Sequence, residues 1–116
     1  MPDHKLIELD IMASTTISTA GSTSPQNVER YTEACIYADV TTRPGTETLA
    51  LTIEDCPDDD PTASTAQWYT HTAFSSISAI GNYVTRITNI GKWLRITYTP
   101  SSTGGWVFSL KGIAKT

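Results

Sequence analysis

The sequence predicts an all-β fold, a single antiparallel β-sandwich of jelly-roll type with about seven or eight strands. Three observations predict it. The chain has 116 residues, the length of one domain. It contains 20 Thr and 11 Ser, and the β-branched Thr favours half-buried sheet surface. Short segments that alternate apolar and polar residues recur throughout and are separated by turn signals, which is typical of sandwiches and small barrels.

The first segments of the chain have partly alternating apolar residues. In residues 5–11, Ile7, Leu9 and Ile11 share one face, which predicts a strand. Residues 1–12 as a whole are expected to form either an edge strand of the sandwich or an extended arm that adds to a neighbouring subunit. A short strand near residues 16–18 follows, within a segment rich in Ser, Thr and Gly.

The next segment has two interpretations. Val28, Tyr31 and Cys35 fall at helical spacing, which would suit a short helix. The continuous run over residues 34–40 is instead typical of a buried strand. We therefore favour a strand over residues 33–40, preceded by a loop.

Turn signals then delimit the middle of the chain. Pro44 and Gly45 predict a turn, and the segments on either side of it are expected to pair as a hairpin. Residues 48–54 alternate cleanly. An acidic loop over residues 55–61 ends that strand, and its two prolines oppose further sheet pairing. The aromatic and Thr-rich residues 67–74 predict another strand.

Three further strands are predicted in the C-terminal third. The first spans residues 82–90 and follows Gly81. The second spans residues 93–98 and places Leu94, Ile96 and Tyr98 on one face. The third spans residues 106–111. The whole chain, residues 1–116, is thus expected to be one domain.

Composition argues against several classes of function. The net charge is −4 and the eight Lys and Arg residues are scattered, so we expect no nucleic-acid binding. No segment approaches the length of about 18 apolar residues that spans a bilayer, and the N-terminus lacks the pattern of a signal peptide. We therefore expect a soluble protein made in a cytoplasm, without a membrane partner. With two histidines, His4 and His71, and no Gly-x-Ser-x-Gly motif, we expect no enzyme.

The acidic loop is the first candidate site. Asp55, Asp58, Asp59 and Asp60 form the main carboxylate cluster of the sequence. Three uses remain open: a solvated loop tip, a Ca²⁺ site of flexible oxygen ligands, or docking against a basic patch on a partner. The spacing differs from that of an EF-hand loop. We expect no cofactor and no metal, and name Asp58, Asp59 and Asp60 as candidate partner contacts.

The remaining candidates are apolar residues and the two cysteines. Leu6, Ile7 and Leu9 in the N-terminal segment are predicted partner contacts, because an unpaired edge strand seeks another chain. Trp93 lies on the strand face opposite Leu94, where it would be exposed and available as an interface anchor. Most aromatic residues are expected in the core, with an aromatic platform for sugars as the rival interpretation. Cys35 and Cys56 are expected to be reduced thiols, although a bridge between them stays open.

The order of these segments resembles a family of small β-sandwich proteins encoded among the structural genes of tailed phages. The segments that support the resemblance span about residues 33–114 and read ADVT (38–41), PGT (44–46), LALTIE (49–54), CPD (56–58), QWY (67–69), KWLRITYT (92–99) and GGWVFSL (104–110). Cys56 and Trp93 depart from the family pattern, and the acidic loop is longer.

The resemblance implies a structural protein of the virion. It would bind the outside of an assembled phage capsid as a decoration or cement protein and stabilise the shell. The implied partners are the major capsid protein and further copies of the chain, as a dimer or trimer, and the location is the capsid surface of a virion made in a bacterial cytoplasm. Two alternatives remain open: a carbohydrate-binding or host-adhesion module of a tail or head fibre, and a neck or tail connector.

Overall fold

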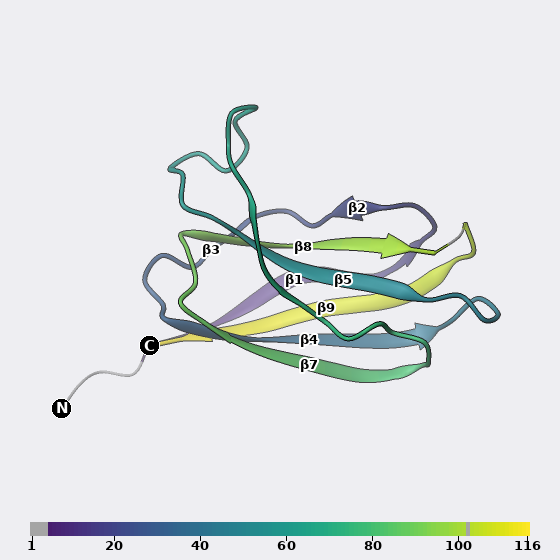
Figure 1. The fold of residues 1–116 in the computed structure, drawn as a ribbon. Coiled ribbons are helices and arrows are strands. Elements are labelled where there is room, and N and C mark those ends of the chain that lie inside the picture. The colour runs from purple at the N-terminus through teal and green to yellow at the C-terminus, as the bar shows by residue number, and fades with distance from the viewer. Residues whose placement is uncertain (1–4, 102) are drawn as a thin grey trace.

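The computed structural model describes residues 5–101 and 103–116 and shows a sandwich of two antiparallel sheets (Figure 1). The strands are β1 (Leu6–Ile17), β2 (Gly21–Ser22), β3 (Gln26–Asn27), β4 (Glu33–Thr42), β5 (Leu49–Cys56), β6 (Tyr69–Ala73), β7 (Gly81–Thr88), β8 (Trp93–Pro100) and β9 (Trp106–Lys115). One sheet has the order β1-β9-β4-β7 and the other β2-β8-β5-β6, with β3 also paired to β8. The predicted all-β sandwich is confirmed.

The connections have the order of a jelly roll. When β2 and β3 are taken as one interrupted strand, each sheet has four strands, and the chain crosses from one sheet to the other at every connection except that between β5 and β6, as in two Greek keys. Two of the nine strands are only two residues long, which explains why the alternation of apolar residues predicted seven or eight. Within the described residues, no helix is long and apolar enough to cross a membrane.

The predicted hairpin around Pro44 and Gly45 is wrong. β4 pairs with β7 and β9, whereas β5 pairs with β6 and β8, so the two strands belong to opposite sheets. The physical reason is that each strand has one strongly apolar face. Placing the strands in facing sheets buries both faces against each other, which side-by-side pairing in one sheet would not do. Gly45, at φ +58°, allows the sharp change of direction.

Other expectations need smaller corrections. The strands predicted near residues 5–11 and 16–18 are one strand, β1, which pairs along β9 with register shifts after Asp10 and Met12. From Leu6 onward the N-terminal segment is thus an edge strand, while residues 1–4 lie outside the described residues. The helical interpretation of Val28, Tyr31 and Cys35 is wrong, because β4 begins at Glu33 as favoured.

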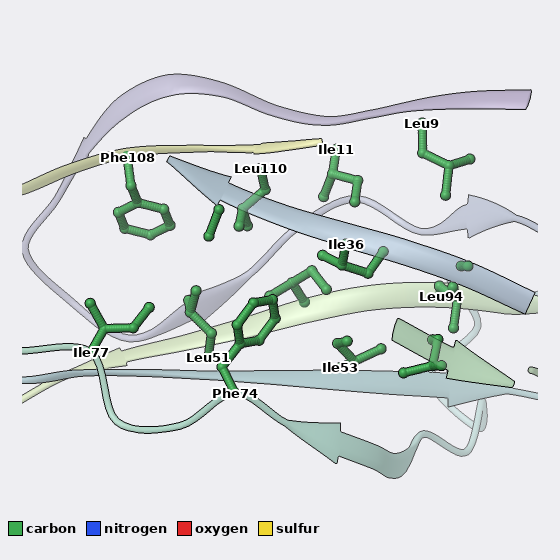
Figure 2. Close-up of a cluster of buried hydrophobic side chains, with 14 of the residues drawn as sticks. Leu9, Ile11, Ile36, Leu51, Ile53, Phe74, Ile77, Leu94, Phe108 and Leu110 are labelled. Carbon is green, nitrogen blue, oxygen red and sulfur yellow. The ribbon is translucent and has the colours of Figure 1, made fainter. Parts of the chain in front are cut away.

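The core lies between the two sheets and consists of side chains from alternate strand positions (Figure 2). Ile36 of β4 and Phe108 and Leu110 of β9 face Leu51 and Ile53 of β5, and all five are fully buried. Phe74 and Ile77, which follow β6, belong to the same buried cluster. Such burial of apolar surface is the main stabilising contribution to the fold, and it holds both sheets as a rigid frame for the surface residues.

Candidate functional site

Most of the predicted contact residues lie at one end of the sandwich. The register places Leu6 beside Lys115, Lys115 beside Glu33 and Glu33 beside Thr88, across the first sheet. In the second sheet Trp93 is beside Cys56, from which the acidic loop departs. Figure 1 shows this end on the left, near the C-terminus, with the loop between β5 and β6 projecting from it. We call it the loop end.

The N-terminal candidates divide between surface and core. Leu6 is 62% exposed and Ile7 is 39% exposed, so both are accessible to a partner. Leu9 is only 3% exposed and belongs to the core cluster, which means that its prediction as a contact residue is wrong. The physical reason is that the apolar face of β1 turns inward once the strand pairs with β9, where Leu9 is beside Gly112 and has room to fill.

The carboxylates of the acidic loop mainly organise their own loop. Asp58 accepts a hydrogen bond from the Gln67 N–H at 2.7 Å, which ties the start of the loop to its end. Asp60 accepts from both the hydroxyl and the N–H of Thr62. Preceding the loop, Asp55 accepts from the Gly91 N–H at 3.1 Å. These side chains therefore fix the loop shape rather than all pointing toward a ligand.

Asp59 is the carboxylate of the loop that pairs with a cation. Its Oδ1 lies 2.6 Å from Nζ of Lys92, and both side chains are substantially exposed. The hydrogen bond and charge of Lys92 lower the pKa of Asp59 below its ordinary value of 3.8, and the same contact raises the pKa of Lys92 above 10.5. Hydrogen bonds from Thr62 similarly lower the pKa of Asp60. Both carboxyl groups therefore stay ionised to a lower pH than an unpaired aspartate would.

The Ca²⁺ interpretation of the loop finds no support in this arrangement. Residues 5–101 and 103–116 contain no group of three or more His, Cys, Asp or Glu side chains that could hold a metal ion. The loop projects from the sandwich and carries negative charge.

Trp93 is half-buried at the start of β8, an interior strand, and so does not lie on a sheet edge. Arg95 and Trp68 form a contact nearby on the outer face of the same sheet. The guanidinium of Arg95 stacks 4.2 Å from the ring centroid of Trp68, and its Nε donates to Glu54 at 2.7 Å. This contact anchors the returning end of the acidic loop to the sheet. Of the aromatic residues expected in the core, Trp106 and Phe108 are buried, whereas Tyr69 is exposed.

His71 connects the two sheets. Its Nε2 lies 2.7 Å from the carbonyl of Thr88 in β7, and its Nδ1 lies 2.8 Å from the hydroxyl of Thr72. Because a carbonyl only accepts, Nε2 donates this hydrogen bond to Thr88. His71 is therefore a structural link between the sheets.

Sequence reasoning missed the outer face of the β1-β9-β4-β7 sheet. Tyr37 is 39% exposed there and stands between two adjoining grooves of about 410 and 240 Å³. Asp39, Asn82 and Ser109 line the larger groove, and Lys111 borders both. Neither Asp39 nor Lys111 belongs to an ion pair within the described residues. The signal was available in β4, whose outward positions include apolar and aromatic residues besides the buried inward set.

Both cysteines are free thiols. Cys35 is half-buried on that outer face, and Cys56 is buried, with its Sγ 3.7 Å from a carboxylate oxygen of Asp58. The expectation of reduced thiols agrees with this arrangement.

Comparisons with known proteins give similarity of fold. No protein-family model and no curated protein matches this sequence. The SPBc2 prophage-derived protein YomS has a similar structure, with a TM-score of 0.64, 10% identity, and coverage of 100% of this chain and 97% of that one. A protein of the disulfide-linked pili that form Bacillus endospore appendages gives a TM-score of 0.61 at 11% identity, covering 99% of this chain and 91% of that one.

A xylanase structure is also similar in part. The Clostridium thermocellum xylanase 10B, with its CBM22-1 and GH10 modules, gives a TM-score of 0.53 at 11% identity, and the similarity covers 96% of this chain and 26% of that one. At these identities the comparisons show the fold alone. The chain is thus a β-sandwich protein whose structure resembles, over nearly its whole length, a prophage-derived protein and an endospore appendage protein.

Proposed function

We propose that the chain is a non-enzymatic decoration protein of a phage virion. It binds the outside of the assembled capsid through contacts with the major capsid protein, associates with further copies of itself, and needs no cofactor. The observation that best supports this role is the similarity of fold to a prophage-derived protein over essentially the full length of both chains. It agrees with the resemblance of the sequence segments to small structural proteins of tailed phages.

The loop end provides a surface suited to such binding. Leu6 and Tyr69 expose apolar and aromatic area, and Asp59 supplies a negative charge on a protruding loop. An apolar centre beside charged groups is the usual anatomy of a protein interface. A protein that binds the assembled shell better than free capsid subunits shifts assembly toward the shell by mass action. Many symmetric copies make modest individual contacts collectively strong.

The experiment that tests this proposal is a count of the chain in purified virions against the major capsid protein. Hundreds of copies in a simple ratio support a decoration protein. A dozen or fewer would assign it to the neck or tail, and absence from the particle would end the virion proposal.

A variant identifies the surface that binds. Asp59→Asn removes a loop charge and its ion pair with Lys92 but leaves the hydrogen bonds of Asp58 and Asp60 in place, and it should weaken binding to capsids stripped of the protein. Asp10→Asn, which removes an equal charge from an exposed position in the middle of β1 in the other sheet, is the matched control and should bind normally. Equal binding by both variants would remove the loop from the interface.

A second candidate function, carbohydrate binding, is favoured by the Tyr37 grooves. An exposed aromatic ring offers an apolar face for the C–H face of a sugar, and nearby donors and acceptors suit its hydroxyl groups. The lining mixes Asp39 with Lys111, so it complements neither a cation nor an anion, which favours a neutral oligosaccharide. Calorimetric titration with neutral oligosaccharides tests it. Binding that Tyr37→Ala abolishes supports adhesion, and absence of binding at millimolar concentrations rejects it.

A further inference from the structure

The exposed edges of the two sheets differ in how well they are protected. β1 shifts register twice along β9, β6 has five residues and one shift, and β2 and β3 have two residues each. Bulges and short strands are the usual means of preventing pairing between edges. β7 is different, because its eight residues pair with β4 without any register shift and include one charged residue, Arg86. Figure 1 shows β7 as the outermost strand of its sheet.

The backbone of β7 has hydrogen-bonding groups directed away from β4. The carbonyl of Thr88 accepts from His71, which lies in the other sheet, so this carbonyl points outward from the β4-β7 pair. The direction of the backbone groups alternates from residue to residue along an antiparallel strand. The N–H and C=O groups of Asn82, Val84 and Arg86 therefore point to the same free side. A row of such groups is a template for another strand.

The side chains of β7 suit a second copy of the same strand. In an antiparallel pair centred on Val84, Val84 faces Val84 of the second copy, and Arg86 faces Asn82 of the second copy. No like charges meet, and the 43% exposed Val84 side chains bury each other at the centre. Asp39 lies beside Asn82 on β4, so each Arg86 cation is directed toward the Asp39 carboxylate of the other copy. Neither side chain has an ion-pair partner within the described residues.

We propose that two copies of this chain associate through β7, antiparallel about a two-fold axis at Val84, so that their four-stranded sheets become one continuous sheet. The residue pairs 84–84, 82–86 and 86–82 are then hydrogen-bonded pairs, each of which exchanges two backbone bonds. The outer faces with their Tyr37 grooves lie on the same side of the joined sheet. The proposal rests on the self-association in the proposed function, and it does not depend on capsid binding.

Variants that place a charge at Val84, on the two-fold axis, test this arrangement when their association is measured by light scattering and sedimentation. The wild-type protein should dimerise at concentrations of about 100 µM or below. In V84K or V84E alone, like charges face each other at the centre, and self-association should weaken about tenfold or more. An equimolar mixture of V84K and V84E should restore a dimer. Thr99→Lys, on an exposed position of the other sheet, is the matched control and should dimerise as the wild type does.

Each outcome decides the proposal. Circular dichroism first confirms that the variants are folded, as the exposure of Val84 predicts. Monomeric single variants together with a dimeric mixture support pairing at Val84. A monomeric wild type, a dimeric V84K, a mixture that stays monomeric, or loss of the dimer in Thr99→Lys would each overturn it. A dimer absent from virions would instead reject the decoration role and leave this interface in place.

Discussion

Replacing Leu9 by Ala should destabilise the protein strongly, although the sequence suggests a surface residue. Leu9 is 3% exposed, and its Cδ1 and the Cδ1 of Ile36 both border the space above Gly112. Truncating a buried Leu costs about 2.7–5.0 kcal/mol, depending on how far the site collapses around the cavity. Because β1 is an edge strand and can move inward, we expect a loss near the lower limit, about 3 kcal/mol. For a chain of this length that corresponds to a fall in Tm of about 12 °C.

Urea unfolding followed by tryptophan fluorescence measures this change, with Leu6→Ala as the control. Leu6 is on the same strand but 62% exposed, so its truncation should change the free energy of unfolding by no more than about 0.5 kcal/mol. If the two variants lose equal stability, or if Leu9→Ala loses less than about 1 kcal/mol, then Leu9 is not packed in the core and the reasoning fails.

A double-mutant cycle locates the contact. A Cβ at Gly112 would lie 3.2 Å from Cδ1 of Leu9, 3.1 Å from Cδ1 of Ile36 and 3.3 Å from the carbonyl oxygen of Cys35. Gly112→Ala alone should therefore cost about 1–3 kcal/mol through overpacking. In the double variant the new methyl group enters part of the space that Leu9 leaves, so the combined loss should be smaller than the sum by about 0.5–1 kcal/mol. Strict additivity would contradict the contact.

Three further predictions concern the surface. Arg95→Ala should cost about 1–2 kcal/mol in urea unfolding and shift the tryptophan emission, because it removes a partly buried ion pair and a stacking contact together. The pKa of Asp59, measured by NMR, should lie below 3.8 and return to that value in Lys92→Met. Because the folded pKa is lowered, the Asp59–Lys92 pair makes a small, salt-sensitive contribution to stability. That contribution is present above the unfolded pKa and is lost as the pH falls through the folded pKa. Gly45→Ala should lower stability by about 1 kcal/mol in thermal unfolding through backbone strain, because φ is +58° and, among the described residues beyond its two chain neighbours, no atom lies within 4 Å of a new Cβ.

The alternating segments of the sequence predicted the strands because the period of a strand is local. Leu49, Leu51 and Ile53 alternate with polar residues, and they are the buried positions of β5. The same pattern in residues 93–98 correctly placed Leu94 and Ile96 inward. These positions follow from chain geometry alone, since successive side chains point to opposite faces of a sheet.

The candidate contact surface was only partly predictable. Asp59 and Leu6 were named from the sequence and are exposed, whereas Leu9 is buried because the pairing of β1 with β9 turns it inward. The Tyr37 grooves span strands that are far apart in the sequence, so no local pattern could show them. Asp58 and Asp60 look identical in sequence to Asp59, yet they accept hydrogen bonds from Gln67 and Thr62 of the same loop, whereas Asp59 pairs with Lys92.

By itself the sequence determined that this protein is an all-β sandwich, because alternation, turn residues and a Thr-rich composition are properties of neighbouring residues. Only the tertiary structure decided which strands are neighbours. Whether β4 and β5 form a hairpin or face each other across the core depends on how two apolar faces are best buried, and that is a property of the whole molecule. The same applies to the unprotected β7, because a strand becomes an edge only when the order of the sheet is complete.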